Sequence, residues 1–218
     1  QLSVGTPDIG GSRASMAQMA AEELGIPYEN IRTTIADTAT LGYNEVSHGS
    51  RVTYASGLAT IKAARAAVKK LKGRAAAKWG IDEDAVFWED GYAKPAGPNA
   101  GQFDPLPIEK LTAKMGSTGG PIVGHFEATP EGAGVSFATH IVDAEVDKET
   151  GQTKVVRYTV VQDAGKAINP SYVEGQFQGG AAQGIGWALN EEYIYDENGC
   201  LQNSGFLDYR IPVASDLP

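Results

Sequence analysis

The segment Gln176-Phe177-Gln178-Gly179-Gly180-Ala181-Ala182-Gln183-Gly184-Ile185-Gly186 combines three glutamines with a run of glycines and alanines. It follows the turn-forming segment Asp163-Ala-Gly-Lys-Ala-Ile-Asn-Pro170. Glycine lets a backbone approach a bulky ligand closely, and a glutamine amide offers both a donor and an acceptor. The pattern favours a large polar ligand held against main chain. The alternative is a helix that packs closely through Gly and Ala, with Gln176 and Gln183 in solvent.

Composition is that of a folded globular protein, with 218 residues, 42% hydrophobic and 21% charged. The formal charge of -9 argues against nucleic-acid binding, since phosphate contacts need clustered Lys and Arg. The basic stretch from Lys62 to Lys78 is better interpreted as a solvated helix face. A single cysteine, Cys200, excludes an internal disulfide framework and fits a reducing compartment, so we expect a cytoplasmic protein. No apolar run reaches membrane-spanning length.

The pattern of apolar residues predicts an α+β first lobe over residues 1–93. A strand is expected at Gln1–Gly5 and another at Ile31–Ala36. After Gly10-Gly11-Ser12, apolar residues recur at helical spacing until Gly25, which can end a helix. From Thr53 a second, long helix is expected, and 82–93 predicts a hairpin around Asp90-Gly91. The stripe of the long helix is Leu58, Ile61, Ala64, Val68, Leu71 and Ala75.

Residues 94–120 are rich in Pro and Gly and predict a connection, with a short helix at 108–115. Residues 121–218 predict a second α+β lobe with strands at 135–146 and 153–161, a helix at 179–189 and a hairpin at 192–203. The fold class expected is therefore α+β, with two lobes of mixed sheets and packed helices. Because both ends lack a closing element, we expect a truncated or processed chain.

Two further glycine-rich segments stand where a loop meets a helix. In 8–15, the helix start at Gly10-Gly11-Ser12-Arg13 favours an anion, although Ser12 alone could simply cap the helix. In 47–56, hydroxyls accompany the amides around Gly49-Ser50-Arg51, which suits phosphate or the edges of a pterin; a hydroxyl-rich loop with a cap is the alternative. The sequence contains no HExxH, CxxC, GxSxG, P-loop or GxGxxG motif, so a metal bound through protein side chains is not expected.

Taken together, these segments resemble the molybdenum-binding subunit of the xanthine dehydrogenase/aldehyde oxidoreductase family of molybdenum hydroxylases. The resemblance runs in order over nearly the whole chain. The motifs that carry it are Asp8-Ile-Gly10, Gly49-Ser-Arg51, Asp163–Pro170, Glu174–Gly186 and Tyr209-Arg-Ile-Pro212.

The resemblance implies a molybdopterin cofactor, either plain or as the cytosine dinucleotide, which binds molybdenum through its own dithiolene sulfurs. It also implies partner subunits or domains with iron-sulfur clusters and FAD. The substrate would be an aldehyde or N-heterocycle, hydroxylated with oxygen derived from water. By position, the cofactor-binding residues would be Gly10, Gly11, Ser12, Arg13, Gly49, Ser50, Arg51, Val52, Thr53, Tyr54, Gln183 and Gly184.

Two departures from the family pattern concern the site. The family's first loop commonly reads Gly-Gln-Gly, whereas here Ile9 is followed by Gly10-Gly11 without a glutamine. The family's catalytic glutamate lies in a Gly-Glu motif that would follow Pro218. The resemblance therefore implies no catalytic residue in this chain, which we expect to be inactive by itself and to need the remaining parts of the molybdenum subunit.

Two other classes of function stay open. The chain could be a non-catalytic assembly module or divided subunit that docks onto the rest of the enzyme, in which case it should expose an apolar face. It could also be a nucleotide-binding protein that uses the helix starts. The missing phosphate fingerprints speak against the nucleotide-binding alternative.

Overall fold

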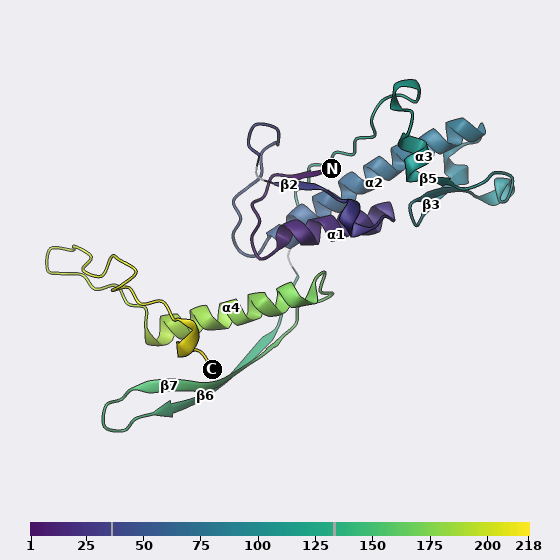
Figure 1. Cartoon of the computed structure of the whole chain (residues 1–218). Helices are drawn as coiled ribbons and strands as arrows, with labels where there is room; N and C mark the ends of the chain where they lie inside the picture. Colours follow the sequence, from purple (N-terminus) through teal and green to yellow (C-terminus); the bar gives the residue numbers. More distant parts are fainter. Residues whose placement is uncertain (36, 133) are drawn as a thin grey trace. The chain divides into compact units, whose positions relative to one another are not determined.

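The computed structural model describes residues 1–35, 37–132 and 134–218, as Figure 1 shows. The chain divides into two compact units, Gln1–Gly132 and Ala133–Pro218. Over the described ranges, helices in both units accompany three small sheets, one parallel and two antiparallel. The predicted α+β class is confirmed. Among the residues that the structure describes, no helix is both long and apolar enough to cross a membrane.

The first unit begins with a strand-helix-strand element. β1 (Leu2–Val4) pairs in parallel with β2 (Thr33–Ile35), and α1 (Ser12–Leu24) lies between them in sequence. The helix ends where predicted, because Gly25 adopts a left-handed φ of 65° and its N–H returns to the last turn. The second strand was predicted to reach Ala36, which lies outside the described residues.

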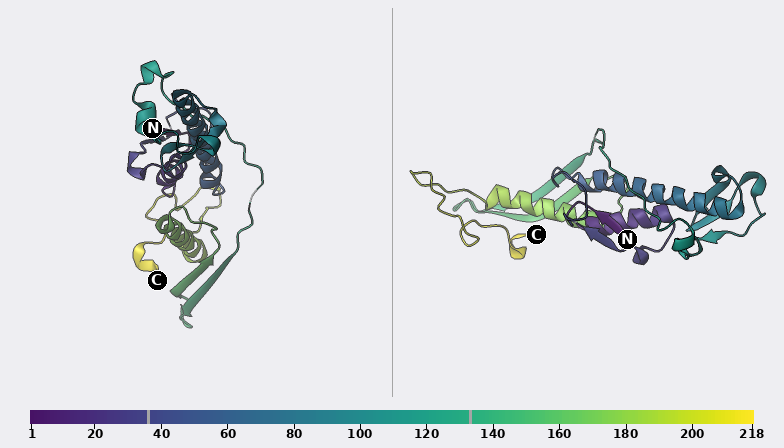
Figure 2. Two further views of the ribbon diagram at one scale, coloured as in Figure 1. Left: turned by 90° about the vertical axis from the view of Figure 1, so that its right-hand side faces the viewer. Right: turned by 90° about the horizontal axis from the view of Figure 1, so that it is seen from above.

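The long helix α2 (Val52–Trp79) runs beside α1 (Figures 1 and 2). Close approach is possible at Gly57, where an added Cβ would lie 2.8 Å from the sulfur of Met19. Nearby, the Thr60 hydroxyl donates to the Met16 sulfur at 3.6 Å. The predicted apolar stripe is buried at Ala64, Leu71 and Ala75 and partly buried at its other positions.

The other half of the first unit is a small core built on α2. Strands β3 (Val86–Glu89), β4 (Tyr92–Pro95) and β5 (Leu106–Pro107) form an antiparallel sheet, and α3 (Ile108–Thr112) follows directly. The predicted hairpin is confirmed at Asp90-Gly91, where φ is 51° and 77°. The core consists of Leu71, Ala75, Ala76, Val86, Ala93, Leu106 and Leu111.

The Pro/Gly-rich segment 94–120 is not where the compact units divide, although the sequence pattern predicts a connection there. Its strands and short helix pack on α2, and the Arg74 guanidinium donates to the carbonyls of Leu111 at 3.0 Å and Gly120 at 2.7 Å. Lys70 likewise donates to the Val123 carbonyl. Part of the basic face expected to be solvated therefore secures this segment.

The second unit is a hairpin and a helix. β6 (Ala138–Val146) and β7 (Thr153–Gln162) pair antiparallel, with a register shift between Asp143 and Ala144. α4 (Pro170–Leu189) packs on β7. It begins earlier than predicted: the Asn169 side chain accepts the Tyr172 N–H and Pro170 occupies the first turn, so the predicted turn is a helix start.

The hairpin predicted at 192–203 is present in reduced form. A single bridge joins Tyr195 and Leu201. The Asn203 side chain extends it, accepting the Ile194 N–H at 2.9 Å and donating to the Glu192 carbonyl.

Candidate functional site

The first glycine loop, before α1, is held in shape by hydrogen bonds between its own residues. Gly10 and Gly11 adopt left-handed φ values of 60° and 77°, and Gly11 is the cap residue of α1. Ser12, which the sequence offered as a cap, instead lies in the first turn and is buried. Its hydroxyl oxygen accepts the Ile9 N–H and donates to the Pro7 carbonyl, both at 3.2 Å. Ser12 therefore holds the loop in shape.

A carboxylate occupies the start of α1. The backbone N–H of Arg13 donates to Asp8 Oδ1 at 3.0 Å, and Arg13 Nε lies 3.4 Å from Asp8 Oδ2. The Ser12 N–H donates to the Ile9 carbonyl. These amides and the arginine, the groups expected to attract an anion, thus already have partners within the protein.

The start of α2 differs in its backbone. Gly49 and Ser50 both adopt left-handed conformations, with φ of 60° and 58°. Within the described ranges, only Ser50 and Asp90 combine a side chain other than glycine with positive φ. Such strained backbone is concentrated at ligand sites and switch regions.

The first turn of α2 leaves polar groups at the surface. No side chain caps the helix, as judged from the described residues, and the first-turn amides have no carbonyl one turn earlier to bond. Thr53 and Tyr54 are exposed, Val52 and Arg51 are half-buried, and the Tyr54 hydroxyl donates to the Glu131 carbonyl at 3.3 Å. The Arg51 guanidinium donates to the Glu45 carbonyl at 3.2 Å and lies 3.9 Å from the Glu45 carboxylate.

The two helix starts lie at the same end of the first unit. The hydroxyls of Thr6, which precedes the first loop, and Ser47, which begins the second, are 3.4 Å apart. Gly5 passes so close to Asn44 that an added Cβ would lie 2.9 Å from the Asn44 Cβ. Sequence reasoning missed this junction, since its partners are 41 positions apart.

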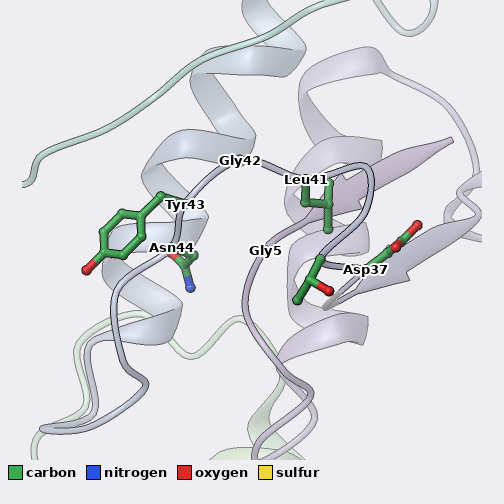
Figure 3. Close-up of a pocket in the computed structure, with 7 residues that line it drawn as sticks. Gly5, Asp37, Leu41, Gly42, Tyr43 and Asn44 are labelled. Atoms are coloured by element: carbon green, nitrogen blue, oxygen red, sulfur yellow. The ribbon is translucent and has the colours of Figure 1, made fainter.

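Beside this junction lies an open hollow of about 390 Å³, which Figure 3 shows where the loop that contains Leu41 and Gly42 arches past Gly5. Asp37 lines it, with the pKa of its carboxyl lowered because it accepts hydrogen bonds from the Thr40 hydroxyl and the Ala39 N–H. The hollow is lined by Gly5, Asp37, Thr38, Leu41, Gly42, Tyr43 and Asn44.

The third segment belongs to the second unit. Gln183 and Gly184 are exposed on α4. Four glycines of this helix have open space where a Cβ would stand, counting neighbours among the described residues: Gly175, Gly179, Gly180 and Gly184.

Gly186, two residues after Gly184 on α4, is closely packed. A Cβ there would meet the Glu191 carboxylate and the ring of Pro212. Next to it, the Tyr209 hydroxyl donates to Glu191 Oε2 at 2.7 Å, and this hydrogen bond raises the pKa of Tyr209 to about 12. Sequence reasoning named the Tyr209–Pro212 motif without finding this contact.

Across the part of the chain that the structure describes, no group of three or more His, Cys, Asp or Glu side chains could hold a metal ion. The donor groups at the two helix starts are backbone amides, hydroxyls and the guanidinium groups of Arg13 and Arg51, which pair with Asp8 and Glu45. Such donors fit the phosphate and the polar edges of a pterin.

Comparison with known proteins gives a consistent result. The large chain of carbon monoxide dehydrogenase from Hydrogenophaga pseudoflava is 32% identical over 212 residues, which cover 95% of this chain and 26% of the relative. The large subunit of nicotine 6-hydroxylase from Paenarthrobacter nicotinovorans is 34% identical over 214 residues, with coverage of 95% and 26%. The chain thus spans about a quarter of the length of these relatives, which are named as large components of multi-subunit enzymes.

Solved structures agree. Cu,Mo-CO dehydrogenase in its carbon monoxide reduced state matches with a TM-score of 0.86 and 28% identity, covering 98% of this chain and 27% of that one. Quinoline 2-oxidoreductase from Pseudomonas putida 86 matches with a TM-score of 0.85 and 26% identity, covering 98% and 28%. The family described as the molybdopterin cofactor-binding domain matches residues 1–218. The chain therefore belongs to the molybdopterin cofactor-binding domain family of the molybdenum hydroxylases.

Proposed function

We propose that the start of α2 binds the phosphate of molybdopterin. The observation that carries this proposal is the left-handed pair Gly49-Ser50, which precedes the cap residue Arg51, together with a first turn that no side chain among the described residues caps. The helix dipole and the first-turn amides of Val52, Thr53 and Tyr54 favour an anion there. The exposed Thr53 hydroxyl adds a donor that suits phosphate oxygens, and the Arg51 guanidinium would exchange its contacts with Glu45 for the phosphate.

The start of α1 has a different role in this proposal. Because the Asp8 carboxylate already accepts from Arg13, a second anion at this helix start would meet like charge. Gly10, Gly11, Ser12 and Arg13 instead bring backbone close to the uncharged pterin edge. Their main-chain groups replace the contact that a glutamine would make in a Gly-Gln-Gly loop.

The exposed amide of Gln183, with Gly184 beside it, is proposed as a further contact to the cofactor. An amide can donate to a ring nitrogen or carbonyl and accept from an amino group, as a pterin edge requires. Open space over the neighbouring glycines allows a flat ring to approach the helix.

When bound, molybdopterin supplies the dithiolene-held molybdenum and its redox chemistry; this chain binds and orients the cofactor. We propose that the complete protein is a cytoplasmic oxidoreductase that hydroxylates an aldehyde or N-heterocycle. The catalytic carboxylate and much of the substrate pocket would come from the remaining part of the molybdenum subunit. Iron-sulfur and flavin partners would carry electrons away. The names of the relatives point to carbon monoxide, nicotine and quinoline as their substrates.

A pair of glycines at opposite ends of α2 offers a matched test. Gly49 before the helix and Gly80 after it adopt φ of 60° and 71°, and neither has a neighbour within 4 Å of an added Cβ among the described residues. Alanine at either position therefore introduces similar backbone strain, of order 1 kcal/mol. Only Gly49 adjoins the proposed phosphate site.

The experiment expresses each variant in the complete molybdenum subunit and measures molybdenum by mass spectrometry and pterin by fluorescence after oxidation. We expect Gly49→Ala to lower both contents several-fold and Gly80→Ala to leave them unchanged. Equal losses in the two variants would show that strain alone is responsible, and normal contents in Gly49→Ala would contradict the proposal.

A second role, docking onto the rest of the enzyme, is favoured by exposed apolar side chains in the second unit. Phe206 and Leu207 are 91% and 97% exposed. Such side chains are typical of an interface. Hydrogen exchange of the 218-residue chain, alone and with the remaining part of the subunit, tests this role: protection should rise over 204–208, and unchanged exchange would exclude it.

A further inference from the structure

A second hollow, lined by aromatic rings and one carboxylate, lies in the second unit and has no part in the proposed cofactor site. Trp187 near the end of α4, together with Glu191, Tyr193 and Tyr209, lines an open hollow of about 370 Å³. None of these residues belongs to the segments proposed to hold the cofactor. We call this hollow the aromatic pocket.

Defined contacts hold the aromatic pocket in shape. The rings of Tyr193 and Tyr209 stack, with their centroids 5.2 Å apart and their planes at 26°. The Tyr209 hydroxyl donates to Glu191 Oε2 at 2.7 Å. The Glu191 carboxylate also packs against Gly186, where a larger residue would collide with it. The carboxylate and two of the rings are therefore positioned before any ligand arrives.

The charge of the aromatic pocket is negative and uncompensated by a protein cation. Within the described residues, no lysine or arginine pairs with Glu191. Arg210, next to Tyr209 in sequence, instead pairs with Asp216 at 3.0 Å. Aromatic faces carry a negative quadrupole, so the rings and the carboxylate attract the same kind of ligand.

We propose that the aromatic pocket binds a small organic cation with an alkylammonium group. Trp and Tyr faces attract the methyl groups that share the positive charge, and Glu191 supplies the countercharge. Trp187 and Tyr193 are 69% and 63% exposed, so a solute can reach them. A purely apolar ligand would leave the carboxylate desolvated without a partner, which is unfavourable.

Calorimetric titration of the 218-residue chain with choline, and with its uncharged carbon analogue dimethylbutanol, tests the proposal. The two probes have nearly the same shape and differ in charge. We expect saturable binding of choline and at least about five-fold weaker binding of the neutral analogue, the ratio that one cation–π contact gives. Equal binding of both probes, or no binding of choline, would overturn the proposal.

Glu191→Gln isolates the carboxylate, because an amide oxygen still accepts the Tyr209 hydroxyl. We expect it to weaken choline binding about five-fold or more, whereas Glu197→Gln, in an exposed turn, leaves it unchanged. Unchanged affinity in Glu191→Gln would overturn the role of the charge. If circular dichroism shows that this variant does not fold, titration of the unaltered chain at rising salt decides instead: choline binding must weaken while dimethylbutanol binding does not.

Discussion

Asp8 and Arg13 form a closed pair at the start of α1: the Asp8 carboxylate accepts the backbone N–H of Arg13 and forms an ion pair with the guanidinium of the same residue. The pair supplies negative charge where the helix dipole is positive. Because of this pair, the start of α1 and the start of α2 differ in the donor groups that they leave for a ligand. At α1 the Asp8 carboxylate accepts a first-turn amide, whereas at α2 no side chain among the described residues caps the first-turn amides, which stay available to a ligand.

Asp8→Ala should lower the free energy of unfolding by about 1 kcal/mol, because it removes an acceptor at a helix start. Urea denaturation followed by the fluorescence of Trp79 and Trp88, both in the first unit, measures the change. Asp8→Asn keeps an acceptor and should lose less. If Asp8→Ala is as stable as the unaltered chain, the pair makes no net contribution.

The same variant should expose the α1 start to anions. Sulfate should then stabilise Asp8→Ala more than it stabilises the unaltered chain, since the freed backbone N–H and guanidinium of Arg13 can donate to an oxyanion. Chloride at equal ionic strength is the control for screening. Equal stabilisation by sulfate in both proteins would mean that Asp8 does not block an anion site.

The end of α1 could be predicted from the local sequence. The start of α4 could not, because its sequence fits two local structures. Gly25 ends α1 as expected, because only a left-handed residue suits that position. Asn169-Pro170 fits a turn and a helix start equally well in sequence. The structure uses it as a helix start, with the Asn side chain as the cap.

For the candidate site, the positions of the loops could be predicted from the sequence. Each loop precedes a helix, which glycine and hydroxyl residues indicate locally. The contact between Thr6 and Ser47 was not predictable, since it depends on the packing of α1 against α2. The difference between the two helix starts is not predictable from the sequence either, because it depends on the Asp8 side chain turning back to accept the Arg13 N–H.

Thr6→Val should disturb the junction between the two loops. Thr6 is 2% exposed, and its hydroxyl contacts the Pro7 carbonyl at 3.1 Å and the Ser47 hydroxyl at 3.4 Å. Valine preserves the shape but cannot make these contacts, so we expect a loss of about 1 kcal/mol in unfolding free energy. In the complete molybdenum subunit the pterin content should also fall. Ser117→Ala, at an exposed hydroxyl of the same unit, should change neither quantity.

Gly124→Ala should separate the segment after α3 from α2. An added Cβ would collide with the Ala63 carbonyl and lie 2.8 Å from the Ala67 nitrogen, both backbone atoms that cannot turn aside. We expect a loss of about 1–3 kcal/mol, measured as a shift in the urea midpoint. Gly116→Ala has no neighbour within 4 Å among the described residues and should cost nothing. Similar losses in both variants would contradict the close approach.

The Tyr209–Glu191 hydrogen bond should be visible in alkaline titration. It raises the pKa of Tyr209 from 10.0 to about 12, because ionised Tyr209 could no longer donate and would face the carboxylate. A raised folded-state pKa means that the stabilisation is complete below pH 10, the unfolded value, and is lost as pH rises toward about 12.

Tyrosinate absorbance is measured against pH for the unaltered chain and for Tyr209→Phe. The difference between the two curves gives the titration of Tyr209 alone. We expect a midpoint near pH 12. In Glu191→Gln the midpoint should move toward 10.0, the ordinary value, because the amide bears no charge and accepts a weaker hydrogen bond. Glu197→Gln, which changes charge at an exposed turn, should leave the midpoint in place. A difference spectrum centred on the ordinary value in the unaltered chain would show that Tyr209 does not donate to Glu191.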